Sequence, residues 1–335
     1  MNTIIKLPAR EREILFRNTA AKCGLNEGIV EKDFWVCWTL DYLFHHSPWS
    51  KHLAFKGGTS LSKCFGLIHR FSEDIDLILD WRLLDIAGKD PWADRSKNQQ
   101  DKFNKALNAE TEVFLLEQFI PRMAEDLRQH LTEPFKLEID LHEPQTVNFT
   151  YPKLFSETSI LPMVRLEIGA LAAWTPTAPA TITPYAAQQY PHVFQHPSTE
   201  ILTVMPERTF WEKVTILHKE AFRTNGNFPS RYSRHYYDLY CMDRSPSKPQ
   251  LMPIQCFWLV SYSSRLVSIL REMPTMSWPN QEPCGSSRRK TALPFCVKTM
   301  DICRICSSAQ SRVSRPSSTA WQDWSGRSTP YDAPP

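Results

Sequence analysis

The chain has 335 residues, of which 42% are hydrophobic and 22% charged, enough for one large or two smaller packed domains. No apolar run approaches the roughly 20 residues of a membrane span, and no signal-peptide pattern opens the chain, which excludes a membrane protein and argues against a secreted one. Nine scattered cysteines favour a reducing cytoplasm, where we expect the protein to act. The net charge of +3 does not by itself indicate a nucleic-acid binder.

Helical and strand patterns alternate along the first 244 residues, which predicts an α/β (α+β) fold. The predicted helices cover 8–23, 27–46, 59–68, 96–130, 206–222 and 231–242. The predicted strands cover 53–55, 73–79, 135–141, 146–151, 162–170 and 201–204, with a Pro/Ala/Thr-rich connection before the last of them. We expect N-terminal helices at 1–50, a sheet-containing core at 51–205 and a helical region at 206–244.

The composition changes near Arg244. Residues 245–335 contain 17 Ser, 11 Pro, five of the nine cysteines and four tryptophans, and their periodic patterns largely stop. Two explanations are open: a disordered tail, or a reading frame that shifted near residue 245. A disordered tail rarely carries so many Trp and Cys residues, which favours the shifted frame. The Cys303–Cys306 pair lacks the second close pair that a structural zinc site needs.

The densest chemical signal begins with Lys56-Gly57-Gly58-Thr59-Ser60, directly after a predicted strand. Two glycines let the backbone turn tightly and approach a ligand closely. A helix that starts at this turn directs its free N–H groups and its dipole at the ligand. The segment therefore predicts a phosphate-binding turn.

Asp74 and Asp76 follow a short helix and a loop, two residues apart on a predicted strand. This spacing directs both carboxylates to one face, where a cation would relieve their repulsion. Magnesium takes one or two protein carboxylates and completes its coordination with water and phosphate oxygens. A phosphate-binding turn beside such a pair is typical of metal-assisted phosphoryl or nucleotidyl transfer. Alone, an Asp-x-Asp pair is often a solvated strand edge, and a Gly-Gly-Thr segment is often only a turn.

The segments Gly57–Leu61 and Arg70–Leu77 resemble the AbiEii/AbiGii-toxin family of nucleotidyltransferases, within the DNA polymerase β-like superfamily. Further matching blocks are Glu31-Lys32-Asp33, Val164–Ile168, Pro206–Lys213 and Arg234–Leu239. The resemblance covers about residues 10–244 and implies a minimal nucleotidyltransferase fold. It also implies transfer of a nucleoside monophosphate from an NTP to an acceptor, expected to be tRNA or another RNA. The protein would be the toxin of a toxin–antitoxin or phage-defence pair, with a separately encoded antitoxin.

The resemblance also implies roles for individual residues. Asp74 and Asp76 would hold Mg²⁺ (or Mn²⁺), with Glu167 as the third carboxylate and Asp140 as its competitor. Lys213 would meet a phosphate, and Asp238 would position Lys213 or the nucleotide. The residues expected to cradle or touch the triphosphate are Gly57, Gly58, Thr59, Ser60, Lys63 and Arg70.

Each role has an alternative. Lys213 lies in an amphipathic pattern that suits a solvated helix face, and Asp238 could pair with Arg234 at helical spacing. The Glu31-Lys32-Asp33 block is expected to pack the domain rather than to carry chemistry. For the whole protein, two further readings are open: an inactive nucleotide-binding remnant with an altered C-terminus, and a phosphotransferase that uses the same site.

Overall fold

A computed structural model describes residues 1–86, 90–91, 93, 95–156, 160–172, 176–221 and 232–245. The chain divides into two units, one formed by Met1–Lys213 and Arg231–Met252 and the other by Val214–Ser230 and Pro253–Pro335. The fold below is that of the first unit. Beyond Ser245, the predicted tail and its Cys303–Cys306 pair lie outside the described residues.

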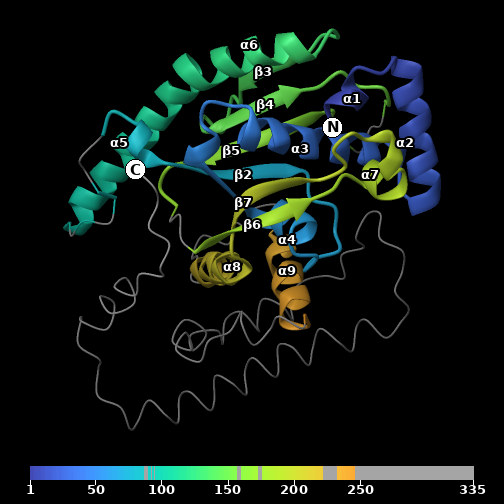
Figure 1. Cartoon of the computed structure of the whole chain (residues 1–335). Helices are drawn as coiled ribbons and strands as arrows, with labels where there is room; N and C mark the ends of the chain where they lie inside the picture. Colours follow the sequence, from blue (N-terminus) through green and yellow to red (C-terminus); the bar gives the residue numbers. More distant parts are fainter. Residues whose placement is uncertain are drawn as a thin grey trace. The chain divides into compact units, whose positions relative to one another are not determined.

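A mixed seven-stranded sheet forms the centre of this unit, in the order β3-β4-β5-β2-β1-β7-β6 (Figure 1). Strand β2 is parallel to β5, and β1 is parallel to β7, whereas the other neighbours are antiparallel. This arrangement confirms the α/β class with a mixed sheet and surrounding helices. The strands are β1 Leu53–Lys56, β2 Asp74–Leu79, β3 Lys136–Ile139, β4 Thr146–Thr150, β5 Met163–Gly169, β6 Thr177–Ile182 and β7 Thr199–Val204.

Helices surround this sheet, and most of them begin or end within a few residues of the prediction. The long helix predicted at 96–130 consists of α5 and α6, joined without a break by one π-helical turn at Leu115–Phe119. The helices are α1 Asn2–Ile5, α2 Ala9–Cys23, α3 Glu27–His45, α4 Gly57–Lys63, α5 Lys97–Phe114, α6 Ile120–His130, α7 Tyr185–Gln189, α8 Pro206–Ala221 and α9 Ser233–Asp243.

Two local expectations are wrong. The Pro/Ala/Thr-rich connection contains the edge strand β6, whose small residues give no apolar alternation and whose Pro179 is tolerated because edge strands leave some N–H groups unpaired. Helix α4 ends at Lys63 instead of residue 68, because the chain turns at Gly66, where φ is +61°.

One face of the sheet is apolar and is covered by α3, which contacts β2, β5 and β7. Trp35 and Trp38 are about 1% exposed and pack their rings against Phe149 of β4. Ile75 and Leu77 of β2 belong to the same core. Because side chains alternate along a strand, the neighbours Asp74 and Asp76 lie on the opposite face. Burial of one face thus leaves the other free for polar groups.

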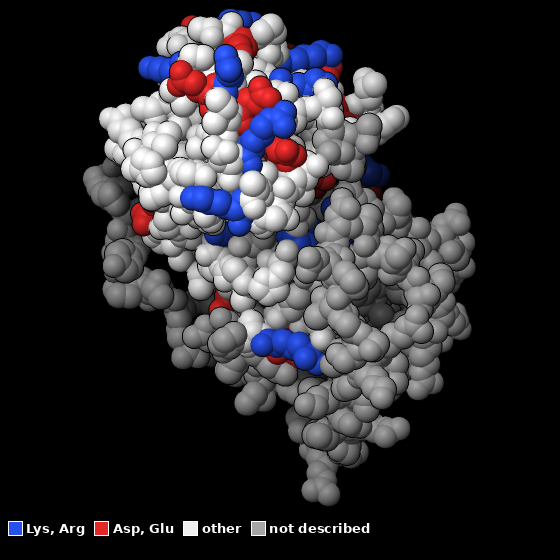
Figure 2. Space-filling model, turned by 90° about the vertical axis from the view of Figure 1, so that its right-hand side faces the viewer, with Lys and Arg blue, Asp and Glu red and all other residues white. Residues whose placement is uncertain are grey.

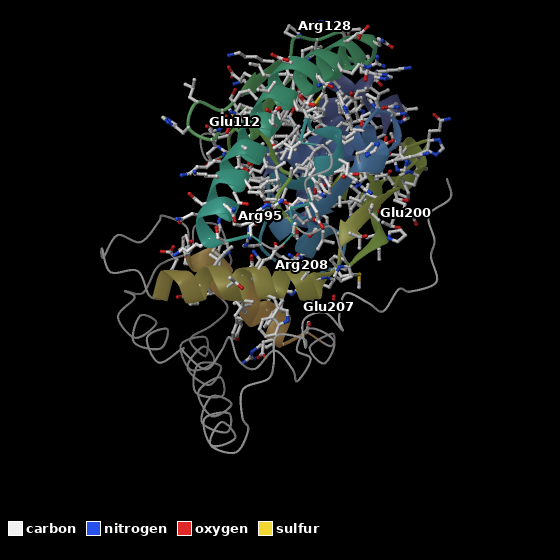
Figure 3. All side chains as sticks on the ribbon, turned by 90° about the vertical axis from the view of Figure 1, so that its left-hand side faces the viewer. Arg95, Glu112, Arg128, Glu200, Glu207 and Arg208 are labelled. Carbon is white, nitrogen blue, oxygen red and sulfur yellow. The ribbon has the colours of Figure 1, made fainter. Side chains whose placement is uncertain are left out.

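Acidic and basic side chains are mixed over the part of the surface that includes α2 (Figure 2). Arg17 pairs there with Glu13 and Glu27. Glu112 and Arg128 lie along α5 and α6, and Glu207 and Arg208 lie on the first turn of α8, with the sheet between the two groups (Figure 3). Among the described residues, no helix is both long and apolar enough to span a bilayer.

Helix α3 begins with a side-chain cap: the Asn26 side-chain oxygen accepts a hydrogen bond from the Gly28 N–H at 2.7 Å. We expect Asn26→Ala to lower the free energy of unfolding by about 1 kcal/mol, because it removes a partner from the first turn of the helix. Denaturant unfolding followed by circular dichroism measures this loss. Asn26→Asp retains the acceptor and serves as the control; equal losses in both variants would contradict the capping role.

Candidate active site

Three carboxylates lie on the polar face of the sheet, on the neighbouring strands β2 and β5. The parallel pairing of β2 with β5 sets Asp76 opposite Glu167 and Asp74 opposite Arg165. Since paired residues of neighbouring strands share a face, Asp74, Asp76 and Glu167 lie on the same side of the sheet. Sequence spacing alone could relate the two aspartates, but only the strand order brings Glu167 beside them.

The glycine turn lies directly against Asp76. Gly57 has φ of +82°, and a Cβ atom built on it would lie 1.8 Å from Asp76 Oδ2. No other amino acid fits this position without moving the carboxylate. Lys56, the residue before the turn, is the antiparallel partner of Asp76 on β1. The predicted phosphate-binding turn and the predicted metal carboxylate are therefore in contact.

The second glycine of the turn is covered by two polar side chains. A Cβ atom on Gly58 would lie 2.8 Å from Arg70 Nη2 and 2.9 Å from Ser72 Oγ. Thr59 and Ser60 are fully buried; Thr59 donates to the Asp74 carbonyl and Ser60 donates to the Gly57 carbonyl. The Thr59 hydroxyl therefore holds the turn to β2, and the Ser60 hydroxyl is bonded within the turn. The phosphate cradle stays a prediction, for which the backbone N–H groups of the turn are the candidate donors.

Arg70, Asp238 and Lys213 form a buried charged cluster. Arg70 donates from Nε to Asp238 Oδ1 at 2.8 Å and from Nη2 to Oδ2 at 2.9 Å. Lys213 Nζ lies 2.9 Å from Asp238 Oδ2. Asp238 is fully buried, and the Lys213 side chain is 8% exposed. Although burial alone would raise the pKa of Asp238, the two cations hold it below its ordinary value.

A second pair of charged side chains joins helix α8 to Lys56, the strand neighbour of Asp76. Lys56 Nζ lies 3.3 Å from Glu212 Oε2, and Glu212 in turn accepts from Arg208 at 3.3 Å. Figure 3 shows Arg208 on the first turn of this helix. Lys213 points instead to Asp238, so consecutive residues of α8 contact β1 and α9. The solvated helix face that the sequence suggests for Lys213 is wrong, because α9 covers that amine.

The structure places Lys63 away from the position expected beside the triphosphate. Its Nζ lies 2.5 Å from Asp33 Oδ1 and donates to the Thr183 carbonyl at 3.0 Å. Burial opposes the charge on this amine, but Asp33 outweighs burial and raises the pKa of Lys63. Lys63 thus joins α4 to α3, which the sequence could not indicate because its partner lies 30 positions earlier.

The Glu31-Lys32-Asp33 block packs the domain. The Glu31 carboxylate accepts from the Leu154 and Phe155 N–H groups, and Lys32 lies 2.6 Å from Glu73. Asp33 accepts from the Tyr185 N–H at 2.7 Å in addition to its pair with Lys63. Glu73 directly precedes Asp74, so this block anchors the start of the strand that carries the aspartates.

The carboxylates on the polar face suit a hard divalent cation. Burial raises the pKa of Asp76, with Asp74 adding to the rise, while Lys56 and Lys213 oppose it. Burial and the two aspartates likewise raise the pKa of Glu167. Within the described ranges, no three His, Cys, Asp or Glu side chains converge closely enough to hold a metal ion by themselves. Magnesium does not require such a set, since water and phosphate oxygens supply most of its ligands.

The family model "Nucleotidyl transferase AbiEii toxin, Type IV TA system" matches residues 40–264. The chain belongs to the AbiEii nucleotidyltransferase toxin family. The matched range starts after the Glu31-Lys32-Asp33 block and continues past Arg244, where the sequence resemblance was expected to stop. It includes both aspartates, Glu167, Lys213 and Asp238.

The other comparisons add less. The solved structure of MenT4, a nucleotidyltransferase toxin from Mycobacterium tuberculosis, is 15% identical, with a TM-score of 0.36 over 65% of each chain. The chain thus spans less than two thirds of that protein, and the likeness carries no argument here. No curated protein matches the chain in sequence.

In this AbiEii family member, Glu167 and Asp140 have different surroundings. Asp140 accepts hydrogen bonds from the His142 and Glu143 N–H groups and from Asn148 Nδ2. Its carboxylate therefore caps a turn, whereas Glu167 is the direct register partner of Asp76. This contrast favours Glu167 as the third carboxylate, a role that stays a prediction.

Arg165 is a site residue to which the sequence reasoning assigned no role. Its guanidinium pairs with Asp140 at 3.4 Å and Glu143 at 2.5 Å, and lies 3.9 Å from both Asp74 and Glu167. The signal that could have identified it is its i,i+2 spacing from Glu167, which directs both side chains to the same face.

His235 of α9 lies near Arg70, Lys213 and Asp238, and these charges affect the pKa of the imidazole. Burial lowers the pKa of His235 to about 4, with Lys213 and Arg70 acting in the same direction and Asp238 opposing them. Among the described residues, nothing hydrogen-bonds to the buried Nδ1 atom. The folded AbiEii family member therefore holds this ring neutral at neutral pH.

We expect His235→Gln to flatten the acid side of the stability profile. Below the ordinary histidine pKa of about 6.5, the unfolded chain binds a proton that the folded chain refuses, so stability falls as the pH drops towards 4. The wild type should lose roughly 1–2 kcal/mol more than the variant across this window. Thermal unfolding midpoints between pH 7 and 4 measure the difference, and parallel curves would contradict it.

Proposed function

We propose that the protein is a Mg²⁺-dependent nucleotidyltransferase that transfers a nucleoside monophosphate from an NTP to an RNA acceptor. The family supplies the reaction class and the toxin context. The observation that carries the proposal is the contact between Gly57 and Asp76, because the turn expected to bind phosphate there touches the carboxylate expected to bind the metal.

Asp74, Asp76 and Glu167 would hold the cation, for which Mn²⁺ is a substitute. When bound, the metal lowers the pKa of the attacking hydroxyl and offsets charge on the leaving pyrophosphate. The chain's own residues would bind the NTP and orient its triphosphate. The Gly57–Gly58 backbone would receive the triphosphate, and Lys213, held by Asp238, would supply positive charge to a phosphate oxygen. With the pKa of the hydroxyl lowered in this way, its proton could pass to water, and little acid–base chemistry would be demanded of the protein.

We propose tRNA as the acceptor, as in the sequence resemblance. The family description places the protein in a type IV toxin–antitoxin system, so a separately encoded antitoxin is the expected partner, and phage defence is the expected context. NTPs and tRNA are cytoplasmic, and the reaction would take place there.

The test supplies the full-length protein with each of the four α-³²P-labelled NTPs, Mg²⁺ and total tRNA. We expect label transfer with at least one NTP, release of pyrophosphate and loss of transfer on addition of EDTA. Asp76→Asn should abolish transfer because it removes a metal ligand while preserving shape. Asp101→Asn, on the exposed face of α5, is the matched control. Transfer that survives in Asp76→Asn would refute the site.

Two other results would redirect the assignment. Release of a nucleoside diphosphate, with γ-labelled phosphate on the acceptor, would show a phosphotransferase that uses the same site. Binding of NTP without transfer to any RNA would identify the inactive remnant that an altered C-terminus would leave.

A further inference from the structure

Arg70 has most of its N–H donors bonded to acceptors of the protein itself. Nε and Nη2 both donate to Asp238, and Nη1 donates to the Phe71 carbonyl at 3.4 Å. The side chain is only 12% exposed. Three of the five N–H groups of Arg70 are used in these bonds. To turn its Nε and Nη2 donors away from Asp238, Arg70 would have to leave a buried carboxylate, which is costly once that carboxylate has been desolvated. The geometry therefore points away from direct phosphate binding.

Arg70 instead determines where Asp238 points. A guanidinium matches a carboxylate through two parallel hydrogen bonds, and this fork sets both the position and the plane of the carboxylate. Asp238 is fully buried, so solvent does not compete for its oxygens. Its Oδ2 atom then lies 2.9 Å from Lys213 Nζ. A lysine amine at the end of a flexible four-carbon stem depends on such a partner for its position.

The same guanidinium also lies against the glycine turn. Arg70 Nη2 occupies the space that a Cβ atom on Gly58 would need, at 2.8 Å. Arg70 therefore contacts the phosphate-binding turn on one side and the acidic partner of Lys213 on the other. The two cations share one carboxylate, so the cluster of Arg70, Lys213 and Asp238 itself keeps one excess positive charge.

We propose that Arg70 is a positioning residue that acts through Asp238 to hold the Lys213 amine beside Asp76 and the glycine turn. This inference rests on the proposed nucleotidyl transfer for its catalytic consequence, but the position of Lys213 can be measured without activity. Arg70 and Lys213 then act as one unit, in which the arginine orients and the lysine contacts the phosphate.

The first measurement requires no turnover. Lysines of the intact protein are labelled with an amine-acylating reagent, and the rate at each lysine is read by mass spectrometry. We expect Lys213 to be protected in the wild type and to react at least 10-fold faster in Arg70→Gln. Lys105, an exposed lysine on α5, reports the reagent's activity. Unchanged protection of Lys213 in a folded Arg70→Gln protein would overturn the inference.

The second measurement is kinetic and uses Arg70→Gln, Arg70→Lys, Lys213→Met and the double variant Arg70→Gln/Lys213→Met. We expect Arg70→Gln to lower kcat by about 100-fold with KM for the NTP changed less than 3-fold, since misplacement of a catalytic group has effects of this size. Arg70→Lys should not restore the rate, because lysine lacks the two-pronged fork. The double variant should be no slower than Lys213→Met alone.

Arg17→Gln, which removes an exposed pair on α2, is the matched control and should leave kcat unchanged. A raised KM with unchanged kcat would assign Arg70 to direct triphosphate binding and overturn the positioning role. Additive losses of kcat in the double variant Arg70→Gln/Lys213→Met would also overturn the positioning role. If the wild type itself transfers no nucleotide, the proposed function fails, while the labelling result still decides the position of Lys213.

Discussion

Gly57→Ala is expected to abolish nucleotidyl transfer and to destabilise the fold. Two effects combine at this residue. Its φ of +82° belongs to the left-handed region, which costs a residue with a Cβ atom about 1–2 kcal/mol. The added carbon would lie 1.8 Å from Asp76 Oδ2, so the carboxylate must move. We expect a total loss of about 2–4 kcal/mol in the free energy of unfolding and at least about 100-fold in transfer rate.

Gly24→Ala separates these two effects. Gly24 ends α2 with φ of +64°, and a Cβ atom there would meet no atom of the described residues within 4 Å. This variant carries the backbone cost without the clash, so we expect a loss of about 1–2 kcal/mol and an unchanged transfer rate. Denaturant unfolding and the labelled-NTP assay measure both variants. An active Gly57→Ala protein would show that the contact with Asp76 has no catalytic importance.

Asp238→Ala is expected to cost more stability than any other single change in the charged cluster. The substitution leaves the Arg70 guanidinium and the Lys213 amine buried beside each other without their carboxylate. Removal of one partner from a buried ion pair typically costs about 3–5 kcal/mol, because the remaining charge keeps its desolvation penalty. The transfer rate should also fall, since Lys213 loses its anchor. Thermal and denaturant unfolding at pH 7 measure the stability loss.

Two further variants serve as controls for this prediction. Asp101→Ala removes an exposed carboxylate paired with Lys105, and we expect less than about 0.5 kcal/mol from it. The triple variant Arg70→Met/Lys213→Met/Asp238→Leu replaces the whole cluster with apolar side chains and should recover most of the stability, as similar replacements do, but none of the activity. A stable Asp238→Ala protein would show that water enters the cluster.

Several features of the site could be read from local spacing. The Gly57–Gly58 pair after a strand indicated a turn that approaches its ligand closely, and the i,i+2 spacing of Asp74 and Asp76 placed both on one face of β2. Both are properties of a few consecutive residues. The edge strand β6 could not be predicted in this way, because its Thr, Ala and Pro residues give no apolar period and only pairing with β7 makes it a strand.

The roles of the lysines depended on distant partners. Lys63 and Lys213 looked equally available in the sequence, yet Lys63 is bonded to Asp33 of α3, and Lys213 is bonded to Asp238 of α9. The choice of Glu167 over Asp140, which the family resemblance implied and which stays a prediction, is likewise supported by the register between β2 and β5. Strand order and helix packing set these distances, and neither is encoded in the spacing around any one of the residues.

From the sequence alone came the family and the α/β class, which depend on patterns spread along the first 244 residues. The glycine turn and the aspartate pair also came from it, because each depends on residue types within a short segment. Only the tertiary structure decided that Asp76 lies against Gly57, that Arg70 and Lys213 share one buried carboxylate, and that Lys63 supports the fold. The physical reason is that a charged side chain acquires its function from the partners and the burial around it. In this protein those partners come from segments as far apart as residues 70 and 238.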